Sequence, residues 1–304
     1  MNNQQILFDE VKKYLDSTDV AFEPIDKGVM SKVFNVTTTR DNYILRYDTA
    51  EESRYPLEAR AMDTAREKGI PTPKSIRTST IDLENNKKIN YMLQERLYGK
   101  ALSDDLPSNI DKLLEQTGVM LKKLHSIKTE RFGHLRPDRV GVVRSWPEFM
   151  FYHFKSSNSD YLEEVDFLTT KELDKATYLI NDRLSRFNLK QGYMLHVDLS
   201  LDHIFHYKDE VEGLIDFQNV GSGDPLYDIA TFEFYSETKY PDKEYSLPLI
   251  KGYGLNVDSK VKEAITFYKL CLAIWKITGR IKSKREDSVP RVHELTKEYI
   301  KELD

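Results

Sequence analysis

The spacing of hydrophobic positions changes about one third of the way along the chain. Residues 33–39 and 43–47 are rich in Val, Thr, Ile and Tyr and flank a polar segment, which predicts a β-hairpin. Residues 57–68 have apolar side chains on one helical face, and a glycine and a proline beyond them end the predicted helix. Residues 76–77 and 90–97 predict two further strands. The first part therefore indicates a small sheet with one helix packed on it.

Beyond Gly99 the apolar residues recur mainly at helical spacing. A clear amphipathic helix is predicted over 110–127, and helical signals return at 148–152, 172–186 and 261–281. A short β-rich stretch at 193–217 interrupts them. With 304 residues and roughly 150 per domain, the pattern predicts an α+β protein of two lobes. We place an N-terminal sheet lobe at 1–94 and a larger, mainly helical lobe at 95–304.

Composition excludes several classes of protein. The 45 Lys and Arg against 50 Asp and Glu give a net charge of −5, which argues against nucleic-acid binding as the main activity. The longest apolar run, 270–275, is far shorter than the roughly 20 residues of a membrane span. No signal peptide is recognisable, and the single cysteine, Cys271, lies at helical spacing among apolar residues, where packing is its expected role. We expect a cytoplasmic protein with no membrane partner.

The stretch 193–217 carries the candidate chemistry. Residues 204–207 and 211–215 predict two strands joined by a tight polar turn. A turn centred between Asp209 and Glu210 would pair His203 with Asp216, with Cβ atoms about 5 Å apart. Asp198 lies five residues before His203 and can reach the same point. One hairpin would thus gather a metal-binding carboxylate, a second metal ligand and a free carboxylate base, which suits phosphoryl transfer.

Structural roles are the alternative for each of these residues. His196 alone would more often be a hydrogen-bonded structural histidine, and Asp202 is typical of a turn. Asp224 followed by proline has the form of a helix start. Asp198 or Asp216 in isolation would also be read as structural. Their combination with the predicted hairpin favours a functional site.

The motif His196-x-Asp198-x4-His203, followed by Asp216-Phe217 and Asp224-Pro225-x-x-Asp228, resembles the aminoglycoside phosphotransferase family. The resemblance implies a bilobal, protein-kinase-like fold, which that family shares with choline kinases and protein kinases. It covers nearly the whole chain, and weaker N-terminal matches follow in the family's order. These matches are residues 43–46, 57–60, 70–73, 91–99 and 118–125.

The resemblance also implies roles for individual residues. Asp198 would orient or deprotonate the acceptor hydroxyl, and His196 would brace the catalytic loop. Asp216 and His203 would hold Mg²⁺ at the phosphates of ATP or GTP. Arg46, paired with Glu58, would bind the nucleotide phosphates, and Gly28 with Ser31 would form the short loop over them. The hinge residues Gln94, Glu95 and Leu97 would offer backbone groups to the base.

Two positions depart from the usual family pattern. His203 stands where most members have Asn, although some aminoglycoside and macrolide kinases are similar to this chain there. Because the ordinary pKa of histidine is near 6.5, we expect activity to fall as the pH drops through that region. Arg46 replaces the commoner Lys, which keeps the charge and changes its geometry.

Three functions are compatible with these residues. The first is a kinase for a hydroxylated, aminoglycoside-like antibiotic, and the second is a kinase for a macrolide or for an endogenous metabolite of the choline, homoserine or sugar type. The third is a nucleotide-binding relic without catalysis. A protein kinase is not indicated, because Gln218 follows Asp216-Phe217 and no Ala-Pro-Glu element is present. Glu233 and Glu237 would either meet substrate amines or form a solvated face.

Overall fold

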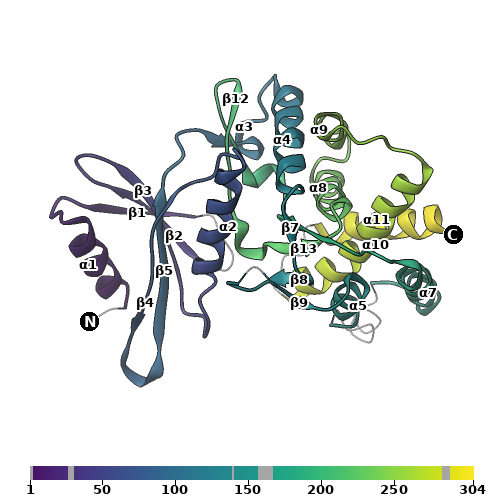
Figure 1. Ribbon diagram of the computed structural model, residues 1–304, viewed down its shortest axis with the longest axis horizontal. Helices are drawn as coiled ribbons and strands as arrows, with labels where there is room; N and C mark the ends of the chain where they lie inside the picture. The colour runs from purple at the N-terminus through teal and green to yellow at the C-terminus, as the bar shows by residue number, and fades with distance from the viewer. Residues whose placement is uncertain (1–2, 27–30, 139, 157–166, 283–287) are drawn as a thin grey trace.

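The N-terminal lobe is a five-stranded antiparallel sheet with a helix on each side (Figure 1). The computed structural model describes residues 3–26, 31–138, 140–156, 167–282 and 288–304. The strand order is β1-β2-β3-β5-β4, and every neighbouring pair is antiparallel. The strands are β1 (Ala21–Ile25), β2 (Lys32–Thr37), β3 (Asn42–Asp48), β4 (Ser75–Asp82) and β5 (Lys88–Glu95).

Alternation along the strands divides the apolar side chains between two cores. Helix α1 (Asn3–Leu15) buries Leu7 and Val11 against one face of the sheet, where Tyr91 of β5 belongs to the same cluster. Helix α2 (Tyr55–Glu67) belongs to the other, larger core, together with Met92 of β5 and the interior of the C-terminal lobe. The helix that carries Glu58 is therefore packed against both lobes.

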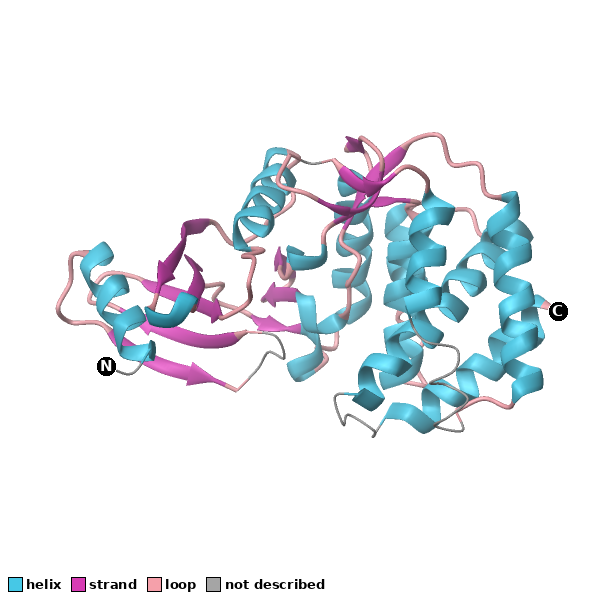
Figure 2. Ribbon diagram, turned by 90° about the horizontal axis from the view of Figure 1, so that it is seen from below, coloured by secondary structure: helices cyan, strands magenta, loops and turns pink. Residues whose placement is uncertain are grey.

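The C-terminal lobe contains two small sheets beside its helices (Figure 2). One sheet has the order β7-β10-β13-β8-β9, and the other has the order β12-β11-β6. Their strands are β6 (Lys100–Ala101), β7 (Lys128–Thr129), β8 (Phe132–Leu135), β9 (Gly141–Val143), β10 (Gly192–Leu195), β11 (Ile204–Tyr207), β12 (Glu210–Leu214) and β13 (Gly221–Gly223). The short 3-10 helices η2 (Leu201–His203) and η3 (Phe217–Asn219) lie in the loops that carry the candidate site.

Long helices enclose the main core of this lobe. Helix α4 packs closely on α9 because Gly118 has no side chain: a Cβ there would lie 2.1 Å from the carbonyl oxygen of Leu249. The helices are α3 (Leu102–Asp105), α4 (Ile110–Leu124), α5 (Trp146–Ser156), α7 (Thr170–Arg186), α8 (Leu226–Lys239), α9 (Ser246–Tyr253), α10 (Ser259–Lys282) and α11 (Val289–Leu303). Across the described part of the chain, no helix has the length and apolar character needed to traverse a membrane.

Most predicted elements agree with the structure, and the α+β fold class is confirmed. The hairpin register is wrong by one residue at its open end. Ile204 pairs with Leu214, and a bulge between Phe205 and His206 shifts the rest of the ladder. The sequence analysis also missed α1, whose buried face is confined to two positions. Cys271 is buried in the core as expected, and burial raises the pKa of its thiol.

Candidate active site

A strained turn after β10 positions Asp198, whose side chain is 17% exposed. Val197 has a φ of 72°, an unfavourable conformation for a β-branched residue. The carboxylate of Asp228, on α8, accepts the backbone N–H groups of His196 at 2.6 Å and of Val197 at 2.7 Å. Asp228 is fully buried and also contacts Nε2 of His125 at 3.0 Å. This anchor keeps the turn in the conformation that places Asp198.

His196 lies behind the turn and is fully buried. Its Nε2 is 2.9 Å from the carbonyl oxygen of Ile215, the residue before Asp216. The imidazole therefore links the two loops that carry the candidate carboxylates. Burial lowers the pKa of His196, which favours the neutral ring. The position suits the bracing role that the resemblance implies, and the side chain has no access to an acceptor.

Asp198 receives hydrogen bonds from three elements outside its own loop. Oδ1 accepts from the Tyr235 hydroxyl of α8 at 2.6 Å and from Lys276 Nζ of α10 at 3.0 Å. Oδ2 accepts from Asn219 Nδ2 at 3.3 Å. Burial raises the pKa of Asp198, but the charge of Lys276 and the hydrogen bonds outweigh that effect and hold the pKa well below its usual range. Asp198 is therefore ionised at neutral pH.

His203 and Asp216 lie side by side despite the shifted register, with Nε2 and Oδ2 3.6 Å apart. Nδ1 of His203 donates to the carbonyl oxygen of Asp198 at 2.6 Å, which fixes the ring with Nε2 facing Asp216. Two ligands about 2.1 Å from one ion span this gap, so the pair fits a shared Mg²⁺. Within the described ranges, no group of three or more His, Cys, Asp or Glu is placed to hold a metal. Phosphate oxygens and water would complete the shell, as is usual for Mg²⁺.

A chain of charges connects this pair to the N-terminal lobe. Arg46 of β3 contacts Glu58 of α2 at 2.5 Å and Asp216 at 3.3 Å. The Glu58 side chain is 0% exposed and that of Arg46 12%. Burial by itself would lower the pKa of the Arg46 guanidinium. The negative charges of Glu58 and Asp216 outweigh this effect and raise the pKa. The predicted pair is thus formed and extends across the lobes to Asp216.

The structure brings the other residues predicted to contact the nucleotide together less completely than Arg46 and Glu58. Gly28 lies outside the described residues, and Ser31 directly precedes β2. Gln94 and Glu95 belong to β5, and the N–H of Glu95 is donated to the carbonyl of Lys74 at 2.9 Å, so this N–H is not available to a nucleotide base. Leu97 lies beyond the strand, in the connection between the lobes.

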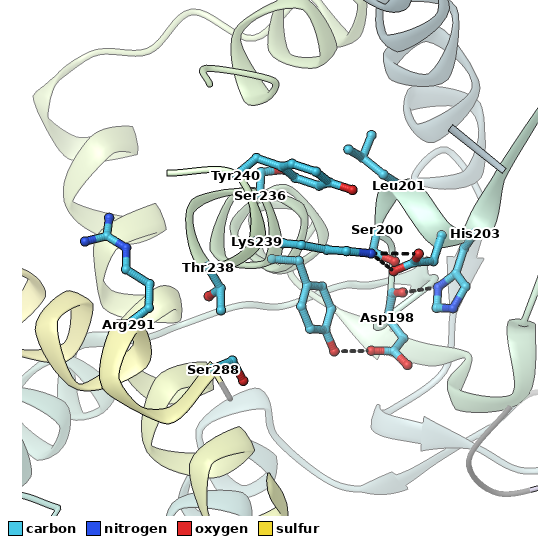
Figure 3. A pocket seen from close by; sticks show the side chains of 12 residues that line it. Asp198, Ser200, Leu201, His203, Ser236, Thr238, Lys239, Tyr240, Ser288 and Arg291 are labelled. Atoms are coloured by element: carbon cyan, nitrogen blue, oxygen red, sulfur yellow. Dashed lines mark hydrogen bonds and ion pairs between the residues drawn. The ribbon is translucent and has the colours of Figure 1, made fainter. Parts of the chain in front are cut away.

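A cavity of about 520 Å³ opens in front of Asp198 (Figure 3). Its walls come from the catalytic loop, α8 and the start of α11, with Arg291 on the side opposite Asp198. Lys239 of α8 donates to Asp202 at 3.0 Å across this space. Asp202 therefore lies in η2, as a turn residue would, and also has a cationic partner. Tyr240 adds an aromatic face. The cavity accommodates a small molecule whose hydroxyl approaches Asp198.

Glu233 and Glu237 are not a solvated face, contrary to one expectation. Lys269 of α10 donates to both carboxylates, at 2.6 Å and 2.8 Å, and its own side chain is buried. Burial raises the pKa of Glu233. The two acids are therefore already paired within the protein. Asp224 accepts the N–H of Leu226 at 3.0 Å, which supports its expected structural role at the start of α8.

Tyr235, Lys276 and Asn219 were missed by the sequence analysis. Tyr235 and Lys276 are 37 and 78 positions from Asp198 and come from two different helices. Their side chains meet at the carboxylate only because α8 and α10 pack together. Lys276 does follow the longest apolar run of the sequence directly, and a charge at the end of such a run is the one signal that marks it.

Comparisons with known proteins identify the fold and the family. Solved structures with the same fold include aminoglycoside phosphotransferase APH(4)-Ia, with a TM-score of 0.78, 13% identity and coverage of 99% of each chain. An aminoglycoside 2′-phosphotransferase-IIIa variant bound to GDP has a TM-score of 0.69 at 14% identity and covers 98% of this chain and 97% of its own. A putative fructosamine-3-kinase from Haemophilus somnus 129PT has a TM-score of 0.67 at 15% identity, over 96% of each chain. No curated protein sequence matches this chain.

These likenesses confirm the bilobal, kinase-like fold that the sequence motifs predict. Family assignment comes from the sequence itself. The profile of the phosphotransferase enzyme family matches residues 21–262, which include β1, the hinge and the whole catalytic stretch. This span is well over half of the chain. The protein therefore belongs to the phosphotransferase enzyme family and is, as its motifs predict, a phosphotransferase that acts on alcohol groups.

Proposed function

We propose that the chain transfers the γ-phosphate of ATP or GTP to a hydroxyl of a small molecule, with an aminoglycoside-like antibiotic as the first candidate acceptor. The observation that carries this proposal is the position of Asp198. Its ionised carboxylate faces a cavity of about 520 Å³ on one side, and Asp216 lies beyond it with His203 and Arg46. An acceptor in the cavity and a nucleotide between the lobes would meet at Asp198.

Each residue has a distinct part in the proposed reaction. Asp198 accepts the hydrogen bond of the acceptor hydroxyl and aims its oxygen at the phosphorus. Arg46 binds the nucleotide phosphates, held in place by Glu58. Asp216 and His203 would hold Mg²⁺, which when bound neutralises negative charge on the phosphates. Because phosphoryl transfer needs mainly positioning and charge neutralisation, these residues suffice for the chemistry.

Two classes of acceptor have specific support. The aminoglycoside class is supported by neighbours of the same fold, one of them a variant of APH(4)-Ia in a complex with ADP and hygromycin B, with a TM-score of 0.77 and 14% identity over 97% of each chain. An endogenous hydroxylated metabolite is the second candidate. Asp202 is paired with Lys239, and Glu233 and Glu237 share Lys269, so these three acids together offer a polycation about one unpaired negative charge. The fructosamine-3-kinase neighbour supports the same class.

Nucleotide turnover by the purified protein tests the proposal. ATP and GTP are each offered with aminoglycosides, macrolides, choline, homoserine and sugars, in the presence of Mg²⁺. We expect turnover that depends on one acceptor class and is lost in Asp198→Ala. The responding class identifies the acceptor. Tight nucleotide binding with no turnover for any acceptor would instead support a non-catalytic protein.

A further inference from the structure

Lys276 is a largely buried cation that contacts the catalytic carboxylate from outside the family motif. It lies on α10, and its Nζ is 3.0 Å from Asp198 Oδ1. Its side chain is 20% exposed, and the ammonium lies over the rings of Tyr235 and Trp275, at 5.2 Å and 4.9 Å from the centroids. A buried lysine is costly unless it is paired, so the contact with Asp198 compensates for its burial.

The hydrogen bonds on Asp198 are unequal between its two oxygens. Oδ1 accepts both Lys276 Nζ at 3.0 Å and the Tyr235 hydroxyl at 2.6 Å. Oδ2 accepts a single, longer bond from Asn219 at 3.3 Å. Burial raises the pKa of Tyr235 to about 12, so its hydroxyl stays protonated and continues to donate. Because a carboxylate oxygen has two lone pairs, Oδ1 is saturated and Oδ2 can accept one more donor.

We propose that Lys276 is a positioning residue for the phosphoryl transfer, acting together with Tyr235. The two side chains fix the Asp198 carboxylate by Oδ1, so that Oδ2 is the atom that receives the acceptor hydroxyl. The positive charge of Lys276 also offsets that of Asp198, which reduces the repulsion between this carboxylate and the incoming anionic phosphoryl group. The inference rests on the proposed function and assigns a role to a residue that the catalytic motif does not contain.

The test compares Lys276→Met with Lys276→Arg and with a matched control. Methionine keeps most of the side-chain length and removes the ammonium, so the carboxylate loses its charged donor on Oδ1. We expect kcat to fall about 10- to 100-fold, since a small misplacement of a reacting group has effects of this size. Nucleotide affinity should stay within about twofold, because Arg46 and Glu58 belong to the other lobe. Lys276→Arg should recover most of the lost kcat, since it restores the charged hydrogen bond.

Lys269→Met is the control. Lys269 lies two helical turns before Lys276 on the same helix and is also buried and paired, but with Glu233 and Glu237 rather than Asp198. It should lower thermal stability and leave kcat nearly unchanged. Equal losses of kcat in the two methionine variants, or no rescue by arginine, would overturn the inference.

Tyr235→Phe keeps the inference testable if Lys276→Met does not fold. It removes the other donor to Oδ1 with little change of shape, and we expect a fall in kcat about 3- to 10-fold with unchanged nucleotide affinity. An unchanged kcat in this variant would contradict the assignment. Absence of acceptor-dependent turnover in the wild-type protein would instead refute the proposed function, so the two failures are distinguishable.

Discussion

Replacing Glu58 by glutamine removes one negative charge from the centre of the molecule and leaves the shape of the side chain nearly unchanged. Glu58 is completely buried and holds Arg46, whose guanidinium also contacts Asp216 at 3.3 Å. After the change Arg46 keeps only one ionised partner, on the catalytic lobe. We therefore expect a loss of stability and a guanidinium drawn away from the position in which it binds phosphates.

The expected magnitude follows from the burial of the pair. Breaking a buried ion pair by removing one partner costs about 3–5 kcal/mol. Asp216 remains beside Arg46, and the glutamine carbonyl still accepts a neutral hydrogen bond worth about 1 kcal/mol. These two effects reduce the expected loss to about 2 kcal/mol, which corresponds to a change of about 30-fold in the unfolding equilibrium.

Urea unfolding measures the stability, and titration with a fluorescent nucleotide analogue measures the affinity. Glu10→Gln is the control. Glu10 of α1 pairs at 3.3 Å with Arg77 of β4, which lies in the same sheet as Arg46, and both side chains are about one-third exposed. It should cost less than about 1 kcal/mol and leave nucleotide affinity unchanged. A Glu58→Gln variant as stable as Glu10→Gln, with wild-type nucleotide affinity, would refute the assignment of Glu58 as the support of Arg46.

Three further changes have expected outcomes. His203→Asn should keep Mg²⁺-dependent turnover and lower the Mg²⁺ concentration needed for half-maximal rate, since oxygen ligands suit Mg²⁺ better than imidazole; a complete loss of activity would contradict this. Thr169→Ala removes the capping box with Glu172 and should cost about 1 kcal/mol in urea unfolding. Burial raises the pKa of Glu172, but its hydrogen bonds to Thr169 outweigh this effect and lower the pKa. The stabilisation by the ionised Glu172 is therefore fully present above about pH 4.3, the pKa of an unperturbed Glu. The difference in stability between the wild type and Thr169→Ala should shrink as the pH falls below that value. Gly118→Ala places a Cβ 2.1 Å from the Leu249 carbonyl and should cost at least about 1–3 kcal/mol, measured as a lower midpoint of thermal unfolding.

Local patterns in the sequence predicted the elements that their own residues determine. The helix around Glu58 and the strand of Arg46 follow from spacing alone, whereas their pairing was implied only by the family resemblance. The register of β11 and β12 does not, because the turn is centred between Lys208 and Asp209, with Tyr207 opposite Glu210, and not between Asp209 and Glu210. The bulge between Phe205 and His206 then changes the pairing again toward the open end, and counting residues from a turn cannot foresee a bulge.

The same distinction applies to the active site. Asp198 and Asp216 stand in short motifs, and the sequence alone singles out both as candidates. Tyr235 and Lys276 occupy ordinary positions on their helices, and their relation to Asp198 depends on how α8 packs against α10. Burial of a lysine is costly enough to demand a partner, but the partner is specified by tertiary structure.

Each of the two proposed catalytic carboxylates is paired with a cation from outside its motif, and the two cations belong to different lobes. Lys276 holds Asp198 within the C-terminal lobe, whereas Arg46 reaches Asp216 from the N-terminal sheet. The first pair is independent of the distance between the lobes. The second exists only while the lobes are close, and nucleotide phosphates would compete with Asp216 for the same guanidinium. Nucleotide binding is therefore expected to free Asp216 from Arg46 at the point where its carboxylate is needed for the metal, while Asp198 stays fixed for the acceptor.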